Sequence, residues 1–242
     1  MIKERIENNE LTVGTWQQIA SPEISGILAS QNFDWICLDA EHGVFELSDI
    51  RDCCQAIQNK GNACFVRLPA CDPIWVRRSL DAGIDGLIIP MVHSEEIART
   101  AVKYAKYPPL GERGYGFSLA NTFGLSFDDY AAQANDRIPL IAQIEHIDAV
   151  NNIDSILAVD GIDGVIIGPY DLSGSMGIVG QMDHPKLKDA CDTVLKQCLA
   201  AGKVSGIHCV SEDKSYLNEA IEKGYRFIAY GMDTVFLSDK RN

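Results

Sequence analysis

Short runs of apolar residues recur along the chain and alternate with longer segments of mixed polarity. Near-continuous apolar runs of about four to eight residues are typical of strands that are buried on both faces of a parallel sheet. The pattern therefore predicts strands at residues 11–17, 35–39, 63–69, 86–92, 140–144, 164–168, 204–209 and 227–233.

The segments between these runs have helical features. The clearest is residues 146–160, where Ile147, Val150, Ile153, Ile156 and Leu157 recur at the spacing of one helix face. Capping residues, several followed by proline or by acids, predict helix starts near residues 21, 48, 72, 94, 183 and 211. Glycines at positions 83, 202 and 224 fit helix ends.

Strands and helices that alternate over 242 residues favour a TIM (β/α)8 barrel that forms one domain from residue 1 to 242. An open doubly wound sheet is the alternative. We prefer the barrel because eight predicted strands are the number that closes a barrel of this type. The tail after Asp233 is short, and the first residues can form a short helix. Residues 107–117 are rich in proline and glycine and predict a long irregular loop.

The formal net charge of -13 argues against nucleic-acid and anionic-membrane partners, because both would repel the protein. The first residues are polar and charged, and no apolar run reaches the ~18 residues of a membrane span. We therefore expect a cytoplasmic protein. The eight cysteines lack C-x-x-C spacing and mostly fall inside predicted strands and helices, so we expect buried reduced thiols.

Two acids follow neighbouring apolar runs. Glu145 comes after the fifth predicted strand and Asp171 after the sixth, so both side chains should lie on the same rim of the sheet. Two carboxylates can hold Mg²⁺ or Mn²⁺ when waters and a chelating substrate complete the octahedron. The alternative, that each acid only caps the following helix, is equally compatible with this spacing.

Other titratable groups fall at strand ends as well. Asp39, Glu41 and His42 follow the second strand, and a histidine beside a carboxylate can act as a general base, although it can equally be a surface residue. Arg67 ends an apolar run and needs an anion. That anion is either a neighbouring acid such as Asp39 or Glu41, or a substrate carboxylate or enolate.

The residues after the sixth strand, Pro169 to Gly177, are rich in glycine and serine, so their backbone N–H groups can receive a carboxylate or a phosphate. His208 ends the seventh strand and can face the same rim. The lysines fall on predicted helices or loops, and Lys203 lies at the wrong end of the seventh strand for Schiff-base chemistry. The pattern thus disfavours a covalent amine mechanism.

Six short motifs, in this order, together resemble the class II pyruvate aldolases of the HpcH/HpaI family. They are Leu38-Asp-Ala-Glu-His-Gly43, Val66-Arg-Leu-Pro69, Pro90-Met-Val92, Tyr107-Pro-Pro-Leu-Gly-Glu-Arg-Gly114, Gln143-Ile-Glu145 and Ile167-Gly-Pro-Tyr-Asp-Leu-Ser173. The resemblance spans nearly the whole chain, and it favours the metal site over two helix caps.

The resemblance implies a metal-dependent aldolase that cleaves a 4-hydroxy-2-oxo acid, such as a 2-keto-3-deoxy sugar acid, to pyruvate and an aldehyde. Its cofactor would be Mg²⁺, Mn²⁺ or Co²⁺, and the family assembles as a hexamer. By matching position, Glu145 and Asp171 would bind the metal, Arg67 would stabilise the enolate, and His42 with Asp39 would form the base. The implied substrate-binding residues are Gln143, Tyr170, Ser173 and His208.

The sequence departs from the family pattern in three places. The family often has alanine at the position of Tyr170, an aliphatic residue at the position of His208, and a longer final helix that packs on a neighbouring subunit. These departures leave the aldehyde and the full assembly open. Two alternatives remain: a CoA-thioester lyase of the citrate-lyase β type, and a keto-acid-binding protein without catalysis.

Overall fold

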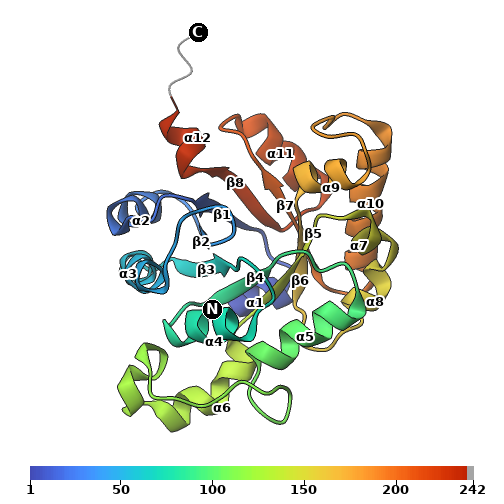
Figure 1. The fold of residues 1–242 in the computed structure, drawn as a ribbon. Coiled ribbons are helices and arrows are strands. Elements are labelled where there is room, and N and C mark those ends of the chain that lie inside the picture. Colours follow the sequence, from blue (N-terminus) through green and yellow to red (C-terminus); the bar gives the residue numbers. More distant parts are fainter. Residues whose placement is uncertain (239–242) are drawn as a thin grey trace.

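The computed structural model describes residues 1–238, whose strands close into a barrel surrounded by helices (Figure 1). All eight strands are parallel to their neighbours, and β8 pairs with β1 to complete the barrel. This confirms the predicted (β/α)8 architecture and excludes the open sheet. The strands are β1 (Thr12–Gln17), β2 (Trp35–Asp39), β3 (Ala63–Arg67), β4 (Gly86–Ile89), β5 (Leu140–Ile144), β6 (Gly164–Ile167), β7 (Val204–Cys209) and β8 (Phe227–Met232).

The helices lie outside the strands in the order that the chain requires (Figure 1). The longer ones cover the outer faces of the strands, and several short ones occupy the strand ends. They are α1 (Ile2–Glu7), α2 (Pro22–Ala29), α3 (Leu47–Gln58), α4 (Pro73–Asp81), α5 (Glu95–Ala105), η1 (Leu119–Gly124), α6 (Phe127–Arg137), α7 (Ile147–Asn151), α8 (Ile153–Leu157), α9 (Pro169–Ser175), α10 (Pro185–Ala200), α11 (Lys214–Lys223) and α12 (Asp233–Leu237).

The apolar side chains form two separate cores. The larger core fills the space between strands and helices, as expected for a barrel whose helices bury one apolar face each. The smaller core fills the barrel interior, where Trp35, Phe65 and Phe227 pack ring against ring. A packed interior leaves the carboxyl ends of the strands as the place where polar groups can gather.

Several local predictions differ from the structure, three of them at helices. The single helix expected at residues 146–160 is broken at Asn152, whose side chain donates a hydrogen bond to the His93 carbonyl. The helix expected to be capped near Ser48 begins one residue earlier and is capped by Glu46. Residues 118–137 contain η1 and α6, which the apolar pattern did not predict, because Ala134 is the only buried residue of α6.

Among the described residues, no helix combines the length and the apolar character needed to cross a bilayer. The short tail predicted after Asp233 begins with α12, and its last four positions, 239–242, lie outside the described residues.

Candidate active site

A buried ion pair joins the ends of β2 and β3. Asp39 and Arg67 are register partners on these neighbouring strands, so their side chains leave the sheet side by side. Arg67 donates from Nε to Asp39 Oδ1 at 2.9 Å and from Nη2 to Oδ2 at 2.7 Å. Burial alone would raise the pKa of Asp39, but the hydrogen bonds and the charge of Arg67 outweigh it and the pKa is lowered. Asp39 is therefore held ionised.

Arg67 makes two further contacts at the mouth of the barrel. Its Nη1 lies 3.1 Å from Glu41 Oε2, and its guanidinium carbon lies 4.4 Å from the ring centre of Trp16. The sequence allowed two kinds of anionic partner for Arg67, a neighbouring acid or a substrate group. The structure shows that the neighbouring acids Asp39 and Glu41 are its partners. The guanidinium still lies at the rim where the other polar groups gather.

Glu41 is a titratable group of this rim that the sequence reasoning placed at a strand end and as a partner for Arg67, but gave no role in the site. Its pKa is raised to about 7, first by burial and then by repulsion from Glu145, Asp39 and Asp171, against the attraction of Arg67. Acids that perturb each other in this way lie close together. The sequence signal that could have identified Glu41 is its position two residues after Asp39, the acid that ends a strand.

Glu145 follows β5 and is held by two donors, one on each carboxylate oxygen. The backbone N–H of Met91 donates to Oε1 at 2.6 Å, and the Gln143 side-chain amide donates to Oε2. Met91 has a φ of 53°, a left-handed conformation that is costly for a residue other than glycine and that accompanies this contact. Burial raises the pKa of Glu145. The two donors thus fix the carboxylate in place, but they do not fully compensate the cost of burying its negative charge.

Neither of the two predicted metal ligands is a helix cap. The helix after Glu145 is capped by His146, and Asp171 lies inside the first turn of α9, whose N-cap is Gly168. Asp171 is exposed at the rim, where its charge acts on Glu41 and Glu145. The structure therefore brings Glu145 and Asp171 to the same end of the barrel, as the strand order predicted.

The residues at this rim suit a hard cation. Three acids, Glu41, Glu145 and Asp171, repel each other, and Gln143 Oε1 is buried with no hydrogen-bond partner. Within residues 1–238, no group of three or more His, Cys, Asp or Glu side chains is arranged as a complete metal site. Two carboxylates with room for substrate oxygens and waters is the arrangement that Mg²⁺ commonly uses.

His42 lies at the rim, but not in the predicted dyad. Its backbone N–H donates to Asp39 Oδ1 at 3.2 Å, whereas no hydrogen bond in the described part of the chain joins its ring to Asp39. The oxygens of Asp39 are taken by Arg67, by the Gln18 amide and by the backbone of Glu41 and His42. Asp39 thus positions the loop that carries His42, and the ring itself is exposed.

The remaining predicted residues have different surroundings. Tyr170 is exposed beside Asp171, whereas the buried Ser173 hydroxyl donates to the Tyr170 carbonyl at 2.6 Å and accepts from Gly180 N–H at 3.0 Å. Ser173 therefore holds the turn with its side chain. His208 stacks on Trp16 with 5.0 Å between ring centres, and burial lowers its pKa to about 3. It is a neutral imidazole at the barrel mouth.

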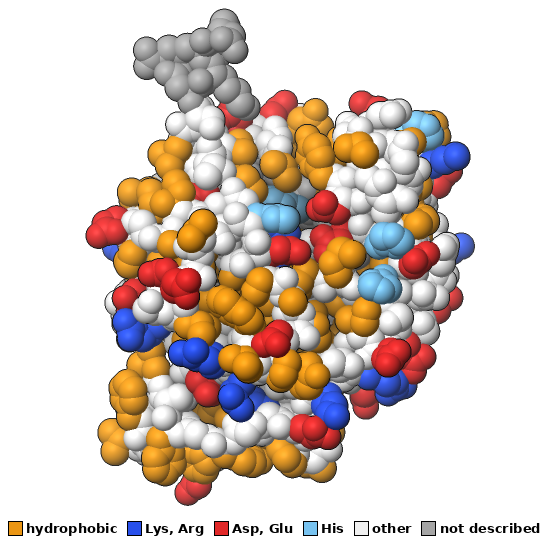
Figure 2. All heavy atoms as spheres, in the orientation of Figure 1, with side chains coloured by type: hydrophobic (Ala, Val, Ile, Leu, Met, Phe, Trp, Pro, Cys, Tyr) orange, Lys and Arg blue, Asp and Glu red, His pale blue; other side chains and the backbone are white. Residues whose placement is uncertain are grey.

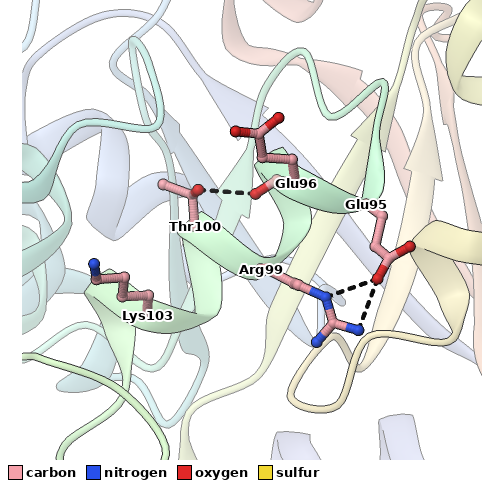
Figure 3. Close-up of a pocket in the computed structure, with 5 residues that line it drawn as sticks. All are labelled: Glu95, Glu96, Arg99, Thr100 and Lys103. Atoms are coloured by element: carbon pink, nitrogen blue, oxygen red, sulfur yellow. Dashed lines mark hydrogen bonds and ion pairs between the residues drawn. The ribbon is translucent and has the colours of Figure 1, made fainter.

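Figure 2 shows acidic and histidine side chains close together near the centre of this face of the molecule. A hollow elsewhere on the surface is lined by five residues of α5 alone (Figure 3). Its Arg99 pairs with Glu95 at 2.7 Å and its Lys103 with Glu112 at 3.2 Å. The strand-end residues, which come from several strands, are therefore the better candidate for chemistry.

Comparison with known proteins agrees with this geometry. The model of the HpcH/HpaI aldolase/citrate lyase family matches residues 12–239. The chain belongs to this family. A 4-hydroxy-2-oxo-heptane-1,7-dioate aldolase of Salmonella dublin is 38% identical over 98% of this chain and 89% of its own, and a 2-keto-3-deoxy-L-rhamnonate aldolase of Escherichia coli K12 is 35% identical over 98% and 88%.

The fold also matches that of a known member of this family. An HpcH/HpaI aldolase/citrate lyase family protein of Burkholderia cenocepacia J2315 superposes with a TM-score of 0.93 at 32% identity, covering 98% of this chain and 94% of that one. These findings confirm the family resemblance and support an enzyme of the class II pyruvate aldolase type. They do not favour the CoA-thioester lyase, since the Salmonella and Escherichia relatives, which match 98% of this chain, are both named aldolases.

Proposed function

We propose that this HpcH/HpaI family member cleaves, and in reverse forms, a 4-hydroxy-2-oxo acid, with pyruvate as one product and an aldehyde as the other. The observation that carries the proposal is the meeting of a buried guanidinium and three mutually repelling acids at one rim of the barrel. An enolate-forming reaction needs such a charged site, because negative charge develops on the keto-acid oxygens during cleavage.

Glu145 and Asp171 are the proposed ligands of a divalent ion, Mg²⁺, Mn²⁺ or Co²⁺. When bound, the ion would supply Lewis acidity toward the keto acid. The two donors on Glu145, from Met91 and Gln143, leave each of its oxygens a further lone pair. The donors therefore orient the carboxylate without blocking it.

The remaining groups handle the proton and the developing charge. During cleavage the 4-hydroxyl loses its proton, the C3–C4 bond breaks, and its electron pair becomes the enolate of pyruvate, which is then protonated at C3. His42 is the proposed acceptor of the hydroxyl proton, since Asp39 fixes the backbone beneath it at 3.2 Å. Arg67 faces the enolate, and the turn that contains Tyr170 and Ser173 is proposed to receive the pyruvate carboxylate.

Exchange of the pyruvate methyl protons tests this proposal without knowledge of the aldehyde. Purified protein with pyruvate in D₂O should incorporate deuterium when Mg²⁺, Mn²⁺ or Co²⁺ is present, and EDTA should abolish the incorporation. The readout is proton NMR of the methyl signal. Absence of exchange with all three ions would overturn the aldolase proposal and leave a keto-acid-binding protein.

We also propose that the chain works as a homo-oligomer, a hexamer by analogy with the family. The supporting observation is a set of three strongly exposed apolar side chains before α6, which we call the apolar edge: Phe117, Phe123 and Leu125. Figure 2 shows hydrophobic side chains along the part of the surface formed by α6 and its neighbours in Figure 1. Exposed groups of this kind commonly mark contacts between proteins.

A further inference from the structure

An aspartate connects the last and first strands of the barrel at its mouth. β8 pairs with β1, and Asp233 follows β8 directly (Figure 1). The buried carboxylate of Asp233 accepts the backbone N–H of Gln18, at 3.0 Å to each oxygen, and the backbone N–H of Ile19 at 2.8 Å. The backbone of Gln18 is therefore held in place immediately after the end of β1.

The side chain of Gln18 lies between two partners that define the orientation of its amide. Its Nε2 donates to Asp39 Oδ2 at 3.0 Å, and Thr234 Oγ1 donates to its Oε1 at 3.3 Å. An ionised carboxylate can only accept hydrogen bonds, so the amide nitrogen must face Asp39. The amide oxygen then faces the Thr234 hydroxyl, and both ends of the amide are satisfied in a single orientation.

Gln18 also lies against the loop that contains His42. In this loop the backbone N–H of Gly43 donates to the Asp39 carbonyl at 2.9 Å. A Cβ atom at Gly43 would lie 2.8 Å from the Gln18 carbonyl oxygen, so only glycine allows the chain after β1 to approach the loop this closely. Gln18 thus contacts the loop through its backbone and Asp39 through its side chain.

Two side chains donate to the Asp39 carboxylate within residues 1–238, those of Arg67 and Gln18. The backbone N–H groups of Glu41 and His42 both bind Oδ1, so Oδ2 is held by Arg67 Nη2 and Gln18 Nε2. Without Gln18, Oδ2 would depend on Arg67 alone, and the carboxylate could turn together with the guanidinium. The guanidinium would then be displaced from the position at which it is proposed to face the enolate.

We propose that Gln18 is a positioning residue of this enzyme, which fixes the rotation of the Asp39 carboxylate and, through it, the guanidinium of Arg67. Asp233 and Thr234 hold Gln18 in place for this role. The inference rests on the aldolase function proposed above and adds a residue that acts through Arg67. Its effect belongs to the step that forms the enolate, because the charge that Arg67 stabilises develops only in that step.

The same substitution at two neighbouring glutamines tests this role. Gln18→Met keeps a side chain of similar length and removes its hydrogen bonds. Gln17→Met does the same on the opposite face of β1, where the Gln17 amide donates to the carbonyls of Ile19 and Ser21 and accepts from Ser25 Oγ. These partners lie before and within α2 and outside the candidate site, so Gln17→Met is the matched structural control.

The kcat and KM of metal-dependent deuterium exchange into pyruvate distinguish the two variants. We expect Gln18→Met to lower kcat about tenfold, the effect of one hydrogen bond, while KM and the midpoint of urea denaturation change little. Gln17→Met should lower the urea midpoint and leave the kcat of the folded protein unchanged. An unchanged kcat in Gln18→Met, or an equal loss of kcat in both variants, would overturn the proposal.

A double variant tests whether Thr234 acts through Gln18. Thr234→Val removes the hydroxyl that faces Gln18 Oε1 and leaves the contact with Asp39 in place. We expect Thr234→Val to lower kcat less than Gln18→Met does, and the double variant to be no slower than Gln18→Met alone. Losses that multiply in the double variant would overturn the role assigned to Thr234.

A crystal structure of Gln18→Met provides a readout that does not depend on activity. The Asp39 carboxylate should be rotated relative to the wild type, with the Arg67 guanidinium displaced along with it. A lowered kcat with both groups unmoved would place the effect elsewhere and overturn the positioning role.

Deuterium exchange by the unmodified protein separates this inference from the proposed function. Absence of exchange with Mg²⁺, Mn²⁺ and Co²⁺ would contradict the aldolase itself. Normal exchange in the wild type, combined with the same kcat in Gln18→Met, would contradict only the role of Gln18.

Discussion

Arg67 has a structural role at the residue scale, to which the proposed function adds a chemical one. It neutralises the fully buried Asp39 through two hydrogen bonds and approaches Glu41 at 3.1 Å, so its removal would leave a buried carboxylate without its partner. Loss of one partner of a buried pair typically costs about 3–5 kcal/mol. Truncation to alanine would therefore confuse loss of activity with loss of fold, and a charged replacement is the sharper probe.

Arg67→Lys should lower the rate of deuterium exchange by about 10²–10³-fold, the cost of removing one preorganised charged donor. Lysine keeps the positive charge but cannot bind both oxygens of Asp39 from one planar group. NMR measures the exchange, and urea denaturation checks that the variant is folded. Arg51→Lys, in an exposed pair with Asp52, is the matched control and should change neither. Activity within twofold of wild type would show that Arg67 has only a structural role.

His208 makes stability depend on pH in a predictable direction. Because its pKa is about 3 in the folded protein and about 6.5 when unfolded, the unfolded chain binds more protons between these values. His208 therefore reduces stability as pH falls from 6.5 toward 3, by up to ~1.4 kcal/mol per pH unit. Urea denaturation at pH 7, 5.5 and 4.5 should show a flatter acid decline for His208→Leu than for wild type. Parallel curves would contradict this assignment.

At the element scale, the strands were predictable and some helices were not. Buried parallel strands need apolar residues on both faces, so all eight are visible as apolar runs. The break at Asn152 coincides with a hydrogen bond to the carbonyl of His93, 59 residues earlier in the chain, and local sequence contains no sign of that contact. Helix α6 buries only Ala134, so it lacks the apolar stripe from which a helix is recognised.

In the candidate site, too, some features were predictable from the sequence and others were not. The strand order alone predicts that Glu145 and Asp171 share a rim, and the pairing of Arg67 with an acid was one of two expected outcomes. In contrast, the ring of His42 is not bound to Asp39, because that carboxylate is occupied by Arg67, Gln18 and two backbone groups. Such competition among neighbours is decided by tertiary packing, which one sequence does not display.

The loop predicted at residues 107–117 is anchored by one side chain. Arg113 is buried, forms an ion pair with Asp81 at 2.9 Å, and lies 4.5 Å from the ring centre of Tyr107 and 5.6 Å from that of Tyr130. It thereby fastens the loop to both α4 and α6. The sequence placed Arg113 in a family motif, and the structure supplies this physical reason for it.

Arg113→Ala should lower the free energy of unfolding by about 3 kcal/mol, because it leaves Asp81 without its partner and removes two cation–π contacts. Arg99→Ala is the control, since Arg99 forms an exposed pair with Glu95 one turn away (Figure 3) and should cost only ~0.5 kcal/mol. Urea denaturation measures both values. A loss below 1 kcal/mol for Arg113→Ala would show that the loop is held mainly by other contacts.

At the scale of the whole molecule, the charge of -13 opposes the binding of any anionic keto acid. The acids at the barrel mouth add to this repulsion, and Arg67 is the cation placed among them. A divalent ion at Glu145 and Asp171 would offset most of this negative charge, because two positive charges would be added beside the guanidinium. The proposed metal would thus assist substrate attraction as well as the proposed chemistry.

The apolar edge leads to a prediction about assembly. Phe117, Phe123 and Leu125 are 74%, 72% and 88% exposed, and Thr122 and Phe123 have φ values of 55° and 54°. A left-handed backbone conformation costs ~1 kcal/mol or more for each residue other than glycine. In this structure it occurs together with an exposed Phe123 side chain. Burial of the edge against another copy would offset the cost of exposing these side chains to water.

Sedimentation velocity should therefore show the wild-type protein as an oligomer. The double variant Phe123→Ser with Leu125→Ser should shift it to smaller species while circular dichroism stays unchanged, because both side chains contribute little to the core of one subunit. Leu199→Ser, which removes an exposed apolar side chain from α10, is the control and should leave the assembly intact. A monomeric wild type would contradict the homo-oligomer, and an unchanged double variant would place the interface elsewhere on the surface.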